Sequence, residues 1–222
     1  VDLDPQGHLT IGLGFSKKVP VTLKNMLENI VMGIKFDPRE VILHHEEGVD
    51  VIPSNKLLSG LDVSLIMAED REIILREYLM LLKEDYDFMI IDRMPSLGML
   101  TINALTAADS VLIPMEPEYY AADGLMELLK VYSAIKAKFN PDLKIEGIVF
   151  TFDTPTFNNS KRNKKAVIST YGDKIRIFKE SIPRAVTIAE TASEGISIFA
   201  YDGSGKGAQS YQKLVEGVLD HA

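Results

Sequence analysis

The sequence predicts an α/β fold in which a mainly parallel sheet is flanked by helices on both faces. Short apolar runs alternate with longer amphipathic segments along the whole chain, as in repeated strand–helix–strand units. Some of these runs are apolar at nearly every position, which is typical of parallel strands buried on both faces. The 222 residues contain no internal repeat, low-complexity stretch or linker, and a domain holds roughly 100–200 residues. We therefore expect a single domain, residues 1–222.

Strands are predicted where short apolar runs end at turn-forming or charged residues. Pro53 stops the first run, because proline cannot donate a hydrogen bond to a neighbouring strand. The runs that end at Asp92 and Ile113 are of the fully buried type. The predicted strands are residues 49–53, 88–92, 110–113 and 145–152.

Helices are predicted over longer segments with helical periodicity, of which 70–83 and 205–219 are amphipathic and 159–171 is polar. Asn140-Pro141 ends the second predicted helix, because proline blocks its continuation. Gly172 fits a C-terminal stop for the third. The predicted helices are residues 70–83, 121–139, 159–171 and 205–219.

Composition excludes several classes of protein. The chain has no Cys, which excludes a disulfide scaffold, an iron–sulfur cluster, a thiol nucleophile and a Cys-based zinc site. Its apolar runs reach about eight residues, whereas a membrane-spanning helix needs about 20. Residues 1–5 have neither the basic start nor the apolar stretch of a signal peptide. We expect a globular, cytoplasmic protein.

One basic stretch interrupts an acidic chain whose net charge is −8. Eight basic and two acidic residues lie between Lys161 and Arg184, so this stretch carries +6. Such a patch can bind a phosphate backbone in a salt-sensitive manner. A solvated helix face explains the same charges equally well.

Two carboxylates, Asp4 and Asp92, lie where predicted extended segments end. Ligands of open α/β sheets bind just beyond the carboxyl ends of the strands. Mg²⁺ prefers oxygen ligands and keeps several waters, so an aspartate that follows an apolar strand suits it. Taken alone, Asp92 is a weak signal, because many parallel strands end in an aspartate that caps a helix.

Eight short motifs, taken together, resemble the ParA/Soj branch of the deviant-Walker ATPases. They occur over the whole chain, in the order and at the spacing of that family. Agreement in order is far more specific than any single motif. The motifs are D-L-D-P-Q-G (2–7), I-P-S-N (52–55), Y-D-F-M-I-I-D (86–92), P-S-L-G (95–98), T-I-N-A-L (101–105), A-A-D-S-V-L-I-P (107–114), E-Y (118–119) and I-P-R (182–184).

The resemblance implies a P-loop NTPase-like fold and roles for the matching residues. Asp4 matches the aspartate that orients or activates the attacking water, and Asp92 matches the one that holds Mg²⁺ through a water. Residues 94–98 match the loop that senses the γ-phosphate, although the family usually has two prolines where this chain has Met-Pro. The residues assigned to nucleotide binding are Pro5, Gln6, Met94, Pro95, Pro183, which lies against adenine in the family, and Arg184.

One part of the family pattern does not occur in the 222 residues. No G-x-x-x-x-G-K-[ST] phosphate loop is present, and the nearest glycine-rich string, 203–207, lacks both the spacing and the Ser/Thr. The family's first strand, phosphate loop and first helix, roughly 35–40 residues, are therefore expected to be absent. Two explanations stay open. A truncated version of a complete ATPase is favoured, because the other motifs are intact; the alternative is a natural protein that has lost the loop.

The resemblance implies ATP-dependent partitioning of chromosome or plasmid DNA. A nucleotide-switched homodimer would use ATP and Mg²⁺, hold DNA non-specifically on the nucleoid, and respond to a ParB-like centromere-binding protein. We expect no membrane contact, because the polar face of the last helix is not rich in Lys and Arg. The alternatives are a non-catalytic DNA-binding or dimerisation module or regulator, and a relative that positions another cargo. The residues expected to bind DNA are Lys161, Arg162, Lys164, Lys165 and Arg184.

His44 and His45 precede two glutamates, a composition that could suggest a metal site. Adjacent side chains in a strand or loop point apart. A solvated or capping role is therefore predicted for both rings.

Overall fold

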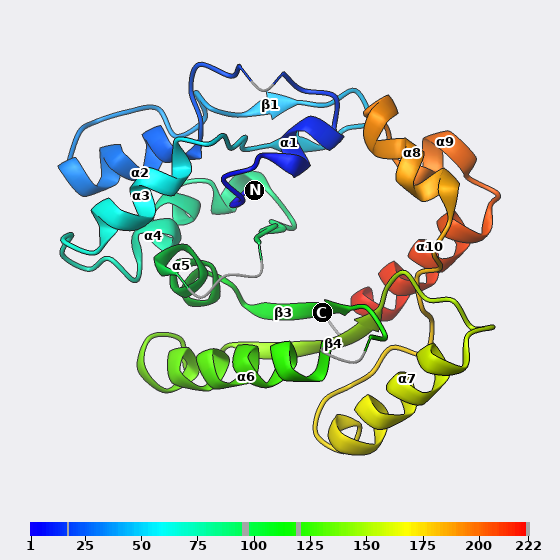
Figure 1. Cartoon of the computed structure of the whole chain (residues 1–222). Coiled ribbons are helices and arrows are strands. Elements are labelled where there is room, and N and C mark those ends of the chain that lie inside the picture. Colours follow the sequence, from blue (N-terminus) through cyan, green and yellow to red (C-terminus); the bar gives the residue numbers. More distant parts are fainter. Residues whose placement is uncertain (17, 95–97, 119–120, 221–222) are drawn as a thin grey trace. The chain divides into compact units, whose positions relative to one another are not determined.

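The computed structural model describes residues 1–16, 18–94, 98–118 and 121–220, which form two compact units (Figure 1). The prediction of a single domain stays a prediction. Unit 1 comprises Val1–Ala108, Ala134–Pro141 and Glu194–Ile196, and unit 2 comprises Asp109–Ser133, Asp142–Ser193 and Ser197–Ala222.

Unit 1 is built mainly from helices around one apolar core. The helix α2 begins with a capping box in which Thr22 and Asn25 satisfy each other's backbone, and it ends at Gly33 in the left-handed conformation. Its buried face packs with Leu58, Leu75 and the fully buried Tyr78. The elements are α1 (His8–Gly12), α2 (Leu23–Met32), α3 (Leu58–Leu65), α4 (Ile74–Met80), the 3₁₀ helix η1 (Lys83–Asp85) and α5 (Met99–Ala107).

The prediction of one helix over residues 70–83 is wrong in extent. The structure has α4 followed by η1. Asp70 adopts a positive φ of 50°, which a right-handed helix cannot contain. The helix therefore starts only after Ile73, which caps it.

The strands of unit 1 are short. β1 (Leu43–His44) pairs antiparallel with β2 (Asp50–Val51), and β2 lies inside the strand predicted at 49–53. The antiparallel partner was not predicted, because two residues leave no periodic signal. Residues 1–3 form a further extended segment, in which Asp2 pairs in parallel with Asp92.

The prediction that residues 88–92 form a fully buried strand is wrong. The segment has one bridge residue, Asp92, and the side chains of Phe88 and Ile90 are 64% and 79% exposed. Met89 and Ile91 pack on the core, so burial alternates with the two-residue period of a half-covered strand. Within the described residues this segment pairs only with residues 1–3, and one face of it stays uncovered.

Unit 2 contains the parallel strand pair that the sequence predicts. The run at 110–113 is not of the predicted fully buried type, because Ser110 is exposed and Leu112 is 39% exposed. β3 (Ser110–Met115) pairs in parallel with β4 (Lys144–Phe150), and α6 (Ala121–Lys138) connects them. The predicted helices at 121–139, 159–171 and 205–219 are confirmed to within one residue at each end. The remaining helices are α7 (Asn158–Tyr171), α8 (Val186–Glu194), α9 (Ile198–Asp202) and α10 (Lys206–Leu219).

The strand β4 carries apolar side chains on both of its faces. Ile148 and Phe150 join one cluster, with Leu125 of α6 and Val167 of α7. Val149, between them, joins a second cluster with Leu214 of α10. Helices on both faces of β4 match the predicted α/β arrangement, whereas β3 is buried on one face and exposes Leu112 on the other.

No helix in the described parts of the chain combines the length and apolar character that crossing a membrane requires.

Candidate functional site

In unit 1, two extended segments that carry carboxylates lie side by side. The Asp2 N–H donates to the Ile52 carbonyl (3.0 Å), and the Leu3 N–H donates to the Asp92 carbonyl (2.8 Å). Asp2 and Asp92 are parallel bridge partners. Parallel segments have their carboxyl ends on the same side. Asp4, just after residues 1–3, therefore lies on the same side as Asp92, which ends the segment 88–92. The structure thus brings the two predicted catalytic residues to one sheet edge.

Asp2 is the buried anchor of this edge, and sequence reasoning gave it no role. Its side chain has no exposed surface. It accepts hydrogen bonds from the Thr10 N–H (2.9 Å), the Thr10 hydroxyl (2.6 Å) and the Asp4 N–H (3.1 Å). The Thr10 hydroxyl in turn accepts from the Ser54 N–H (3.1 Å). Asp2 therefore joins three separate chain segments and fixes the backbone of Asp4.

The turn after Asp4 is tightly constrained. The Asp4 carboxylate accepts a hydrogen bond from the Gln6 N–H (2.8 Å), a local turn typical of aspartate. Pro5 is buried, whereas Gln6 is exposed. Gly7 has φ +66°, and a Cβ there would lie 2.8 Å from the Ser54 carbonyl oxygen. Glycine is thus required for both its conformation and its lack of a side chain.

Asp92 reaches solvent and lies in an unfavourable environment for a negative charge. Partial burial, and then the charges of Asp2 and Asp4, raise the pKa of the Asp92 carboxyl above its ordinary value. A bound cation would relieve this repulsion. Among the described residues no three His, Cys, Asp or Glu side chains form a ready-made metal cluster. The donor set fits Mg²⁺, which is commonly held by one or two carboxylates and keeps several waters.

The segment that follows Asp92 is anchored by Arg93, a second residue that sequence reasoning missed. Its guanidinium donates to the Met94 carbonyl (2.9 Å) and to the Thr101 hydroxyl of α5 (2.7 Å). Burial lowers the pKa of Arg93. Met94 is 38% exposed, and Pro95 lies outside the described residues. The sequence signal that could have pointed to Arg93 is its position as a basic residue directly after the apolar run that ends at Asp92.

In unit 2, the predicted adenine-facing residue lies at the end of β4. Pro183 pairs in parallel with Asp153, and the Arg184 N–H donates to the Asp153 carbonyl (3.2 Å). The Arg184 guanidinium lies over the Phe152 ring, 5.7 Å from its centre. Arg184 is exposed and Pro183 is partly buried, so both can meet a ligand.

Lys164 of α7 does not share the environment of the other predicted DNA-binding residues. Its ammonium group lies 2.7 Å from the Asp153 carboxylate and 3.1 Å from the Ser181 hydroxyl. Asp153 also accepts from the hydroxyls of Ser160 and Ser181, each at 2.8 Å. Burial alone would raise the pKa of Asp153, but the hydrogen bonds from Lys164, Ser181 and Ser160 outweigh it and lower that pKa.

The exposed cations of α7 are Lys161, Arg162 and Lys165. Lys161 and Lys165 are one helical turn apart and therefore share a side of the helix. Arg162 donates to Asn159 in the first turn. A shallow cavity of about 280 Å³ lies against this side of α7, lined by Asp153, Pro155, Ser160, Lys161, Lys164, Lys165 and Ile168.

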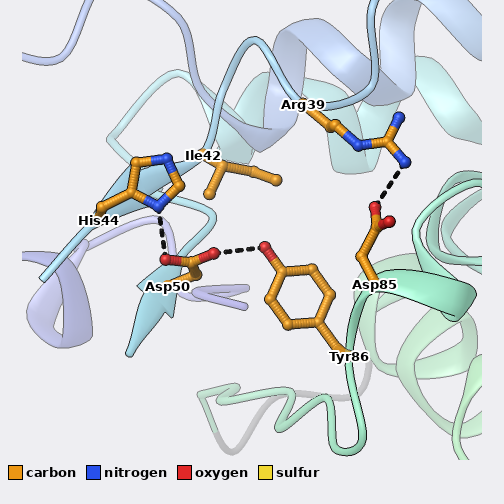
Figure 2. Close-up of a pocket in the computed structure, with 6 residues that line it drawn as sticks. All are labelled: Arg39, Ile42, His44, Asp50, Asp85 and Tyr86. Carbon is orange, nitrogen blue, oxygen red and sulfur yellow. Dashed lines mark hydrogen bonds and ion pairs between the residues drawn. The ribbon is translucent and has the colours of Figure 1, made fainter. Parts of the chain in front are cut away.

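A different cavity, of about 270 Å³, lies in unit 1 (Figure 2). Its wall is a hydrogen-bonded chain in which Asp50 accepts from Tyr86 and contacts the ring of His44, both at 2.6 Å. The hydrogen bond from Tyr86 is the main cause that lowers the pKa of Asp50. Arg39 and Asp85 form an exposed ion pair at 2.6 Å. Each described charge of this wall is therefore matched within it.

The side chains of the two adjacent histidines have different partners, as expected if adjacent side chains point apart. His44 is exposed and pairs with Asp50. His45 is partly buried, and its Nε2 lies 2.9 Å from the Gly195 carbonyl. Because the Glu47 N–H donates to its Nδ1 (3.2 Å), we assign the Nε2–H tautomer, which donates to Gly195.

Parallel segments flanked by helices, with carboxylates at adjacent segment ends, are typical of an α/β protein that binds its ligand at the carboxyl edge of the sheet. A family described as AAA domain matches residues 1–145. Sporulation initiation inhibitor protein Soj of Bacillus subtilis strain 168 is 39% identical over 222 residues, which cover 98% of this chain and 84% of that protein. Chromosome partitioning protein ParA of Myxococcus xanthus strain DK1622 is 39% identical over 217 residues, with coverage of 96% and 74%. The chain belongs to the ParA/Soj family of partitioning ATPases.

A solved structure supports the same fold. Cobyrinic acid a,c-diamide synthase from Mycobacterium smegmatis, crystallised with ADP and magnesium, superposes with a TM-score of 0.83 at 32% identity. The match covers 99% of this chain and 80% of that one.

Proposed function

We propose that this protein partitions chromosome or plasmid DNA by binding and hydrolysing Mg-ATP. The observation that carries the proposal is the placement of Asp4 and Asp92 at the ends of two hydrogen-bonded, parallel segments. Membership of the ParA/Soj family supports the reaction class. The similar structure with bound ADP and magnesium supports the cofactors.

Asp4 and Asp92 divide the chemistry between them. Asp92, an exposed carboxylate whose pKa is raised by burial and by the charges of Asp2 and Asp4, would hold Mg²⁺ through a water. The ion supplies positive charge for the phosphate oxygens during transfer. Asp4, whose backbone is fixed by Asp2, would orient the attacking water. Met94 and Pro95 would sense the γ-phosphate, Pro5 and Gln6 would line the nucleotide, and Pro183 with Arg184 would face the adenine.

We further propose that a phosphate loop from outside these 222 residues completes the site. No G-x-x-x-x-G-K-[ST] occurs in the sequence, so the phosphate-binding lysine of such a loop is not supplied by this motif within the 222 residues. The uncovered side chains of Phe88 and Ile90 are apolar, which suits contact with additional chain. Loss of the loop in the natural protein is the competing hypothesis.

The DNA-binding part of the proposal rests on α7. Lys161, Arg162 and Lys165 are exposed on this helix, and Arg184 is exposed at the end of β4. Such a cluster binds phosphate backbones without reading base sequence. Lys164 is left out of this set because it faces Asp153. We propose a homodimer on the nucleoid in the cytoplasm, stimulated by a ParB-like centromere-binding protein.

Hydrolysis of ATP by Asp4→Ala and Asp92→Ala variants of the full-length protein tests the proposal. We expect both variants to lose hydrolysis while their fold is retained. Asp142→Ala is the matched control, because Asp142 is an exposed aspartate in unit 2. Hydrolysis that both variants retain at the control rate would contradict the assigned roles.

A second candidate function is DNA binding without catalysis. The absence of a phosphate-loop motif from the sequence favours it. Calorimetric titration of Mg-ATP against the 222-residue chain, and then against a version with an upstream phosphate loop, separates the two. Binding only after the loop is added supports the ATPase. No binding in either case, together with DNA binding that ATP does not change, supports the binding module.

A further inference from the structure

Lys164 and Asp153 form a partly buried ion pair that, together with Ser181, joins the helix proposed to bind DNA to the segment proposed to face adenine. Asp153, only 4% exposed, lies three residues after the end of β4. Lys164 of α7 and Ser181 both contact the same carboxylate oxygen of Asp153, at 2.7 and 2.8 Å. Lys164 also donates to the Ser181 hydroxyl at 3.1 Å. These three side chains form a closed triangle of hydrogen bonds.

The triangle spans elements that are far apart in sequence. Lys164 and Ser181 are separated by 17 residues. The backbone of the 181–184 segment is bonded to the end of β4 through the Ile182 N–H to the Phe150 carbonyl (2.8 Å) and the Asp153 N–H to the Ile182 carbonyl (3.1 Å). Movement of α7 away from β4 would break the bonds of Lys164 to Asp153 and to Ser181, the first residue of the 181–184 segment.

Lys164 is chemically unlike its neighbours on α7. Its side chain is 26% exposed, and its ammonium group lies 5.2 Å from the centre of the Phe150 ring. Lys161 and Lys165 are exposed on the same helix. A lysine held by a buried carboxylate has little free charge to offer a phosphate. Breaking such a pair leaves a buried charge without its partner, which is strongly unfavourable.

We propose that Lys164 is a positioning residue that couples DNA contact on α7 to the 181–184 segment through Asp153. DNA held by Lys161, Arg162 and Lys165 restrains α7. The Lys164–Asp153–Ser181 triangle then transmits this restraint to the segment that carries Pro183 and Arg184. The inference rests on the proposed DNA-binding function, and it names the link by which DNA and nucleotide sense each other.

Hydrogen exchange of the Ile182 amide tests this link in the full-length protein, held in its DNA-binding state by a saturating non-hydrolysable Mg-ATP analogue and compared with and without DNA. In the wild-type protein, a saturating short DNA duplex should slow exchange at Ile182 by on the order of tenfold, a typical size for coupling between sites. In Lys164→Met, DNA should bind with an unchanged salt dependence, but the slowing should fall below about twofold. Lys165→Met is the matched control: DNA binding should weaken, while saturating DNA should still slow exchange at Ile182.

The possible outcomes distinguish a failure of the proposed DNA-binding function from a failure of the proposed coupling through Lys164. No DNA binding by the wild-type protein would overturn the proposed function and this inference with it. DNA binding without slower exchange at Ile182 would overturn the inference alone, as would equal slowing in Lys164→Met. If Lys164→Met melts at room temperature, Ser181→Ala replaces it, because this change keeps the ion pair and removes the hydroxyl on the far segment. Ser160→Ala is then the control, since it removes a hydroxyl donor of Asp153 on α7 itself and should keep the response.

Discussion

Removing three exposed cations from α7 should reduce the salt dependence of DNA binding by a calculable amount. The change is the triple substitution of Lys161, Arg162 and Lys165 by alanine. Each cation that neutralises a phosphate of duplex DNA contributes about 0.9 to the slope of log affinity against log salt concentration. Three such contacts therefore give a slope change of about 2.7. Between 50 and 200 mM salt, the wild-type affinity should fall about 40-fold more than that of the triple variant.

Fluorescence anisotropy of a labelled duplex at four or more salt concentrations measures this slope. Lys164→Ala is the comparison, and we expect its slope to match the wild type, because the ammonium group is bound to Asp153. A triple variant with the wild-type slope would place the DNA elsewhere on the molecule. A large slope change in Lys164→Ala would show that this lysine leaves Asp153 when DNA binds, which would refute the assignment of exposed and paired lysines made from the structure.

Three further predictions concern stability and titration. Gly7→Ala should cost about 1–3 kcal/mol, because a Cβ would meet the Ser54 backbone. Gly33→Ala, with nearly the same φ and nothing within 4 Å, should cost only the strain of the left-handed backbone, about 1 kcal/mol; equal shifts of the urea midpoint would contradict this difference. Burial, and then the hydrogen bond to Asp50, raise the pKa of Tyr86 to about 12. The stability that Tyr86 contributes should therefore be complete below its unfolded pKa of about 10 and be lost as pH rises through 12. Tyr86→Phe should abolish this loss in thermal melts at high pH. The pKa of Asp153 is lowered, so its contribution should be present above an unfolded pKa of about 3.9 and be lost as pH falls below it. Asp153→Asn should make acid unfolding less steep, as followed by circular dichroism.

Local sequence patterns predicted those helices whose formation depends mainly on local sequence. The helices α6, α7 and α10 follow from apolar spacing and from the stops at Pro141 and Gly172. The strand at 88–92 was predicted as fully buried because its residues are nearly all apolar, but its burial depends on which chain covers Phe88 and Ile90. Composition reports what a segment can bury, whereas exposure depends on the neighbours that tertiary structure supplies.

The same limit applies to the candidate sites. Asp4 and Asp92 could be proposed from their positions at strand ends. The sequence could not predict the carboxylate that pairs with Lys164 and leaves Lys161 and Lys165 exposed. Four basic side chains on one helix carry equal weight in a count of charges. Only the fold places the carboxylate of Asp153 beside one of them.

Asp2 shows why a matching motif is not yet a working site. Its carboxylate accepts three hydrogen bonds, two from Thr10 and one from the Asp4 backbone. An asparagine would present an NH₂ group in place of one acceptor oxygen, so it could not accept all three with the same geometry. The first aspartate of D-x-D thus fixes the backbone from which the second one projects. Because Asp2 also raises the pKa of Asp92 through its charge, this buried anchor places Asp4 and at the same time strengthens the demand for a cation at Asp92.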